Sequence, residues 1–390
     1  MNKSRVNIAL IGLGGITQAV HLPIVQRLHD LIQITAIVDL SKKRLDDIQS
    51  TTAAGAKQFT SVDALIEAKK GGLQVDGALL ATNGTHAWDA EKLVRAGIKV
   101  LSEKPFGYSL IEHTDMEQAA AETGRPAGDM IRVGYMKEYD PATRAAKEAL
   151  QGKKIRSIRV EVLHPADEAQ LSFANLRARA TDIDVSHLQE STVKTEQSLA
   201  TALGGTDGAL PPNMLRTYRS VVLGSIVHDI ALLRFLVGGI GTVKQASHFG
   251  DEFPGSLFLR GQLQDYDAPW YIDWHFVPEY PEYRETISIL HETGTVQLTF
   301  AVPYLLNVAT ALETVSSLPN LGVQVTRNTW PQMEAFEEEW RNFVALIQGK
   351  SNTVGSSVQE SRKDIIVGQK MIHALYSQTA RDIKLELSCQ

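Results

Sequence analysis

The sequence predicts an α/β protein in which a doubly wound parallel sheet precedes an α+β domain with a large open, mostly antiparallel sheet. From residue 5 to about 136, short apolar runs alternate with helical patterns, which is typical of βαβ units. The first of these runs ends in a glycine-rich turn. Beyond residue 150, several runs instead alternate apolar and polar residues, as half-buried strands do.

The chain has 390 residues, which is more than one hydrophobic core usually holds. We therefore expect two domains, residues 1–136 and 137–390. A polar stretch at about 165–220 within the second domain is too long for a simple connection and predicts a small helical insertion or a lid.

Each element follows from the alternation of these patterns. In the first domain we expect strands over 5–11, 33–38, 57–60, 75–81, 98–102 and 131–136, and helices over about 15–28, 42–50, 62–69, 86–96 and 109–123. In the second we expect a helix at about 141–151 and strands over 155–162, 243–249, 256–264, 270–277, 284–290 and 294–300, the last two forming a hairpin.

Composition excludes several classes of partner and site. A net charge of −6 and a pI near 6.0, without a Lys/Arg cluster, argue against nucleic acid and acidic membranes. The single cysteine, Cys389, excludes an intrachain disulfide, and the histidines lack metal-ligand spacing. No signal region and no run of 18 uninterrupted apolar residues is present, so we expect a cytoplasmic protein.

The glycine-rich turn is a candidate phosphate-binding site. Gly12, Gly14 and Gly15 follow the first strand, and Thr17 stands where a third glycine is common. Asp39 ends the second predicted strand at the spacing at which an acid meets the adenosine ribose, and its charge favours NAD over NADP. The basic residues that follow, 42–44, could accept an extra phosphate, so NADP stays open.

Lys104 is the candidate for proton transfer. It lies in Glu103-Lys104-Pro105, where a buried strand ends, and ligands bind at that end of strands in open α/β sheets. Oxidising a carbinol requires a group that takes the hydroxyl proton, and a lysine with a lowered pKa can do so.

Several segments together resemble the Gfo/Idh/MocA oxidoreductase family. They are Gly12-Leu13-Gly14-Gly15-Ile16, Asp39, the run 75–86, the run 96–105 with its Glu-Lys-Pro, and Val133-Gly134-Tyr135. The resemblance implies a Rossmann domain, bound NAD(P), a second domain for a small polar substrate, and oxidation or reduction of sugar or polyol hydroxyls. It also implies cofactor contacts from Gly12, Gly14, Gly15, Ile16, Asp39, Thr82, Asn83, His86, Glu103 and Lys104, with Lys104 contacting the reacting hydroxyl.

The second catalytic element implied by the family is an Asp-x-x-x-His on a helix. His228 matches the histidine, but Gly224 stands at the aspartate position. Asp229 cannot replace that acid directly, because adjacent helical residues point about 100° apart. Either Lys104 and His228 suffice, or an acid from the insertion substitutes, or the substrate differs and turnover is low.

Three functions remain open on the sequence alone. The leading hypothesis is an NAD(P)-dependent dehydrogenase, and the alternatives are a dinucleotide-binding sensor or scaffold and a carbon–oxygen lyase. Aromatic residues at 270–276 could stack on a sugar, although packing in the core or between subunits explains them more simply. An open sheet also predicts a homodimer or homotetramer.

Overall fold

The computed structural model describes residues 5–166, 180–204, 210–250, 252–350 and 354–388. The chain divides into two compact units. The first consists of Met1–Tyr135, Ala174–Ala209 and Phe336–Lys363, and the second of Met136–Phe173, Leu210–Ala335 and Asp364–Gln390. The first division lies between Tyr135 and Met136, and two later segments return to the first unit.

The first unit is built on a six-stranded parallel sheet with the order β3-β2-β1-β4-β5-β6. Its strands are β1 (Val6–Ile11), β2 (Ile32–Val38), β3 (Lys57–Phe59), β4 (Gly77–Leu80), β5 (Lys99–Ser102) and β6 (Ile131–Val133). The order reverses between β1 and β4, and such a switch point is where ligands bind in doubly wound sheets. The predicted doubly wound domain is confirmed.

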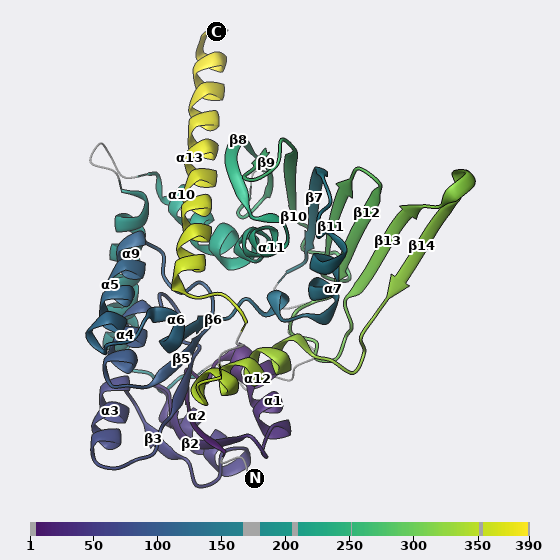
Figure 1. Cartoon of the computed structure of the whole chain (residues 1–390). Coiled ribbons are helices and arrows are strands. Elements are labelled where there is room, and N and C mark those ends of the chain that lie inside the picture. Colours follow the sequence, from purple (N-terminus) through teal and green to yellow (C-terminus); the bar gives the residue numbers. More distant parts are fainter. Residues whose placement is uncertain (1–4, 167–179, 205–209, 251, 351–353, 389–390) are drawn as a thin grey trace. The chain divides into compact units, whose positions relative to one another are not determined.

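Helices cover both faces of this sheet. Figure 1 shows α3, α4, α5 and α9 on one side and α1 and α12 on the other. The helical elements are the π-helix η1 (Thr17–His21), α1 (Leu22–Arg27), α2 (Lys42–Thr51), α3 (Val62–Lys70), α4 (Ala87–Arg95), α5 (Leu110–Glu122), α6 (Ala127–Met130), α9 (Val185–Leu203) and α12 (Ala335–Ile347). Helix α9 comes from the expected insertion, but it lies in the first unit and not in the second domain as expected.

The second unit contains an eight-stranded mixed sheet with the order β14-β13-β12-β11-β7-β10-β9-β8, in which only β7 and β10 pair in parallel. Its strands are β7 (Ile155–His164), β8 (Ile240–Phe249), β9 (Ser256–Leu263), β10 (Pro269–Phe276), β11 (Arg284–His291), β12 (Gly294–Phe300), β13 (Ala311–Ser317) and β14 (Val323–Asn328). The expected hairpin is present, since His291 pairs with Gly294.

One face of this sheet packs against helices, including α7 and α11 (Figure 1). The helical elements of the unit are η2 (Met136–Glu138), α7 (Pro141–Ala149), α10 (Pro212–Thr217), the π-helix η4 (Tyr218–Ile226), α11 (Val227–Val237), η5 (Pro319–Leu321) and α13 (Val358–Ser388), whose first six residues belong to the first unit. Trp270 and Trp274 are buried, which agrees with their interpretation as packing residues.

The helical run Pro212–Val237 is long and apolar enough, by length and composition alone, to cross a membrane. However, 67% of its most apolar window is buried within the protein. Trp274 Nε1 donates a hydrogen bond to Ser225 Oγ in this run at 3.0 Å. Burial and this contact are what a core helix shows.

Candidate active site

The turn after β1 combines a tightly packed glycine with an open one. Gly12 has φ +83°, and a Cβ there would lie 2.5 Å from the carbonyl oxygen of Ala81. At Gly14 a Cβ would meet nothing within 4 Å. The buried Thr17 donates from Oγ1 to the carbonyl oxygen of Gly12 at 2.6 Å and fixes the start of the following helix. The backbone at Gly14 is therefore open to a phosphate, as a dinucleotide requires.

Asp39, directly after β2, is bound to this turn. Its Oδ2 accepts from the Leu13 amide at 2.8 Å and from Arg44 Nη1 at 3.1 Å, and its Oδ1 accepts from the Ser41 amide at 2.8 Å. The side chain of Asp39 is only 6% exposed. The acid expected at the ribose and the glycine turn expected at the phosphates are thus neighbours.

The loop after β4 holds the next predicted residues, Thr82, Asn83 and His86. The His86 amide donates to the Phe106 carbonyl at 3.0 Å, and its Nδ1 donates to the Pro105 carbonyl at 2.7 Å. Burial lowers the pKa of His86, although the hydrogen bond to Pro105 opposes this effect, so the imidazole is neutral at neutral pH. This loop is consequently joined to the segment that follows Lys104.

The insertion also supports this loop. Glu112 on α5 is buried, and its Oε1 accepts from Thr85 Oγ1 at 2.5 Å while its Oε2 accepts from Ser198 Oγ on α9 at 2.7 Å. Sequence analysis did not identify Glu112 or Ser198, since they are 86 residues apart.

Glu103 is held at the end of β5 by a buried chain of side chains. His21 Nε2 lies 2.9 Å from Glu103 Oε1, and Trp340 Nε1 on α12 donates to His21 Nδ1 at 3.1 Å. Burial opposes the charge of Glu103, but the hydrogen bond from His21 and the nearby charge of Lys104 hold its pKa below the usual value. The Lys104 amide donates to Glu103 Oε2 at 3.2 Å, so this carboxylate orders the backbone of the candidate proton-transfer residue.

The predicted residues of the first unit thus follow β1, β2, β4 and β5, which are adjacent in the sheet. Because carboxyl ends of parallel strands share one edge, all four segments lie along it, at the switch point. The set that the structure places there comprises Gly12, Gly14, Gly15, Ile16, Asp39, Thr82, Asn83, His86, Glu103 and Lys104.

His228 lies in the second unit, at the start of α11, and is half-buried. Gly224 is exposed and lies in the π-helix η4, which ends at Ile226. The predicted spacing of one turn between positions 224 and 228 assumed an α-helix, but the two lie across a junction between π- and α-helix. Such π-helical turns are common at functional sites.

Helix α11 is anchored by Arg234. Its guanidinium donates to both carboxylate oxygens of Asp364 on α13, at 2.8 and 2.9 Å, and to Glu138 Oε1 at 3.0 Å. Paired bonds of this kind fix orientation as well as position. They attach the helix that carries His228 to Asp364 and Glu138.

Asp229 is buried beside a group of ionisable side chains. Glu285 pairs with Lys137 and accepts from the hydroxyl of Tyr283 at 2.5 Å. Burial, and then repulsion from Glu285, raise the pKa of Asp229 well above its usual value. Asp229 therefore belongs to a buried polar cluster with Lys137, Tyr283 and Glu285.

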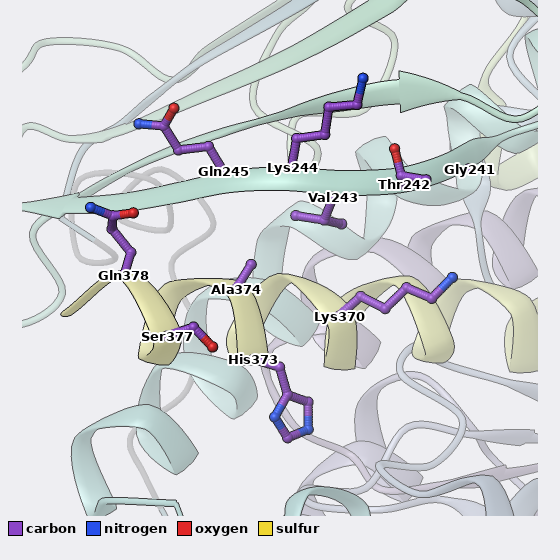
Figure 2. Close-up of a pocket in the computed structure, with 10 residues that line it drawn as sticks. All are labelled: Gly241, Thr242, Val243, Lys244, Gln245, Lys370, His373, Ala374, Ser377 and Gln378. Atoms are coloured by element: carbon purple, nitrogen blue, oxygen red, sulfur yellow. The ribbon is translucent and has the colours of Figure 1, made fainter. Parts of the chain in front are cut away.

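A separate cleft of about 460 Å³ lies between the edge strand β8 and α13 (Figure 2). In Figure 2 the side chain of His373 points away from β8, and Lys244 extends away from α13. None of the predicted site residues lines this cleft, whose walls are formed by Gly241–Gln245 and by residues of α13 between 370 and 378. The two lysines that line this cleft, Lys244 and Lys370, are exposed to solvent and therefore do not form a buried anion-binding site.

Residues 6–128 match the model of the Gfo/Idh/MocA oxidoreductase family, described as an NAD-binding Rossmann fold. Among solved structures, the WlbA dehydrogenase from Bordetella pertussis in complex with NADH and UDP-GlcNAcA superposes with a TM-score of 0.65 at 17% identity, covering 96% of this chain and 98% of that one. The UDP-N-acetylglucosamine 3-dehydrogenase GnnA from Acidithiobacillus ferrooxidans gives 0.65 at 17% identity, with 96% and 99% covered.

The 3-ketoreductase KijD10 from Actinomadura kijaniata in complex with NADP gives 0.65 at 15% identity, with 96% and 97% covered. At these identities the likeness to all three structures concerns the fold. No curated protein sequence matches this chain.

Proposed function

We propose that this chain, whose residues 6–128 match the Gfo/Idh/MocA oxidoreductase family with its NAD-binding Rossmann fold, transfers a hydride between NAD(P) and a hydroxyl-bearing carbon of a sugar, polyol or related small molecule. One observation carries the proposal. Glu103 and Lys104 follow β5 directly, at the same sheet edge as the glycine turn and Asp39, and Glu103 is held there by buried partners.

The residues present fit a dinucleotide. The open backbone at Gly14 suits a pyrophosphate, and Asp39 suits the ribose hydroxyls. When bound, the nicotinamide supplies or accepts the hydride. Lys104 takes the hydroxyl proton at Nζ during oxidation and returns it during reduction. For His228 the prediction stays that it orients the hydroxyl or shares the proton transfer.

Nucleotide-linked sugars are the first substrates to test. The WlbA structure contains UDP-GlcNAcA, and GnnA is named as a UDP-N-acetylglucosamine 3-dehydrogenase. Both cover nearly the whole of this chain, which makes their substrate class a reasonable starting panel alongside free sugars and polyols.

The decisive experiment compares Lys104→Met with a control, Lys70→Met, at an exposed lysine on α3. NADH binding is followed by nicotinamide fluorescence, and turnover by the NADH absorbance band over the panel. We expect Lys104→Met to bind NADH normally and to lose about 10²–10⁴-fold in turnover, the usual size of general acid–base catalysis. Near-normal turnover in Lys104→Met would contradict the assignment.

Gly224 supports a second candidate, a dinucleotide-binding sensor with little catalysis. It leaves no carboxylate at the position where the family pattern has one, and a side chain there would meet only the Arg219 carbonyl oxygen, at 3.6 Å. Tight NADH binding without an absorbance change for any compound of the panel would favour the sensor. Product formation without net cofactor change would instead indicate a lyase.

A further inference from the structure

The side chain of Asp182 accepts hydrogen bonds from the start of helix α2. This start follows closely on Asp39, the acid expected to contact the adenosine ribose. Its Oδ1 accepts from the hydroxyl of Ser41 at 2.5 Å, and its Oδ2 accepts from the amide of Lys43 at 2.9 Å. Asp182 belongs to the insertion and is 139 residues from Lys43 in sequence, yet it lies in the same unit as α2. A carboxylate from a distant segment thus accepts two hydrogen bonds beside the expected adenosine site.

In a Rossmann domain, the residues after the second strand decide between NAD and NADP. An acid there bonds to the ribose 2′-hydroxyl, whereas a nearby arginine accommodates the 2′-phosphate of NADP. In this chain four of the donors at this turn have protein partners, although the exposed side chains of Lys42 and Lys43 lie nearby. Arg44 and the Ser41 amide donate to Asp39, while the Ser41 hydroxyl and the Lys43 amide donate to Asp182.

Charge acts in the same direction. The hydrogen bonds from the Lys43 amide and from Ser41 lower the pKa of Asp182, so its carboxylate is ionised at neutral pH. Arg44 already pairs with Asp39, so the Asp182 carboxylate adds a negative charge to this turn, and it would repel the roughly two negative charges of a 2′-phosphate bound beside it.

We propose that Asp182 occupies the position of the 2′-phosphate and makes this protein select NAD over NADP. The inference rests on the proposed function, because it presumes that a dinucleotide binds at Asp39. The choice between NAD and NADP would then depend on the insertion as well as on the segment after β2.

The test measures the dissociation constants of NADH and NADPH by fluorescence for the wild type, Asp182→Asn and Asp182→Ala. The control is Glu190→Gln, which removes an equal charge from the exposed face of α9. We expect NADPH affinity to rise on the order of tenfold relative to NADH in both Asp182 variants, the scale of removing one close charge. Glu190→Gln should keep the wild-type ratio.

An unchanged ratio in both Asp182 variants would overturn the inference, and so would a wild type that binds NADPH as tightly as NADH. Loss of NADH affinity in Asp182→Asn would show that Asp182 supports the turn instead of excluding a phosphate, which also overturns it. If the wild type bound neither dinucleotide, the proposed function itself would fail, and that outcome is distinguishable from the others.

Discussion

The indole nitrogen of Trp340 donates to Nδ1 of His21 at 3.1 Å, and this contact sets the tautomer of the histidine. An indole N–H can only donate, so Nδ1 must be the unprotonated nitrogen. The hydrogen is therefore on Nε2, which donates to Glu103 at 2.9 Å. Trp340 and His21 are both fully buried, so the orientation of Glu103 depends on α12, more than 230 residues further along the chain.

Replacing Trp340 with Phe should remove the hydrogen bond to His21 while an aromatic ring still fills most of the same space in the core. The ring would still pack on Phe343, whose centroid lies 5.9 Å away, but the buried His21 Nδ1 would lose its donor. We expect the free energy of unfolding to fall by about 1–3 kcal/mol, the usual cost of an unsatisfied buried group. Urea denaturation of the wild type and the variant measures the change.

A double-mutant cycle with Glu103→Gln tests whether His21 couples the two residues. If it does, the double variant loses less stability than the two single variants together, by about 0.5 kcal/mol or more. Strict additivity would show that Trp340 and Glu103 act independently.

Alanine substitutions at Gly12 and Gly14 should distinguish an effect on stability from an effect on ligand binding. In Gly12→Ala the new Cβ would lie 2.5 Å from the Ala81 carbonyl oxygen, and φ is +83°, a conformation that alone costs an L residue about 1–3 kcal/mol. In Gly14→Ala the Cβ enters open space on the proposed phosphate side. We expect Gly12→Ala to lower the melting temperature and Gly14→Ala to leave it unchanged.

Titration with NADH completes the comparison. Gly14→Ala should weaken NADH binding despite its normal stability, since the Cβ would lie between the backbone amides and the pyrophosphate. Normal NADH affinity in Gly14→Ala would place the cofactor elsewhere. Gly55→Ala is the control. Gly55 is exposed and has φ +85°, and a Cβ there would meet no atom within 4 Å, so this variant shows the effect of backbone strain away from the proposed site.

The central features of the first unit could be predicted from sequence because their signals are local. Parallel strands such as β1 and β4 are buried on both faces and therefore appear as continuous apolar runs, and Asp39 follows its strand directly. Strands β13 and β14 were missed, because β14 is almost entirely exposed and has no apolar face to reveal it. The contacts of Trp340 with His21, and of Asp182 with Ser41, join residues 319 and 141 positions apart, so no local pattern indicates them.

Asp229 provides the last prediction, which concerns pH. Because burial raises its pKa in the folded protein, the folded state holds a proton that the unfolded chain releases above the ordinary value of 3.8. Stability should consequently fall as pH rises from about this value toward the raised pKa. Asparagine resembles the protonated acid in shape and does not titrate, so Asp229→Asn should show a flatter dependence of unfolding free energy on pH.

The measurement is urea unfolding from pH 5 to pH 8, with the surface variant Asp267→Asn as a control that should retain the wild-type slope. The free energy of unfolding of Asp229→Asn, relative to that of the wild type, should increase with pH. Only the wild type has a buried carboxyl group at this position whose protonation becomes less favourable as pH rises. A variant that instead loses more stability at pH 8 than at pH 5 would mean that Asp229 is ionised and that its charge stabilises the cluster with Lys137. In that case Lys137 would be shared between two carboxylates, and Lys137→Met would destabilise the protein more at high pH than at low pH.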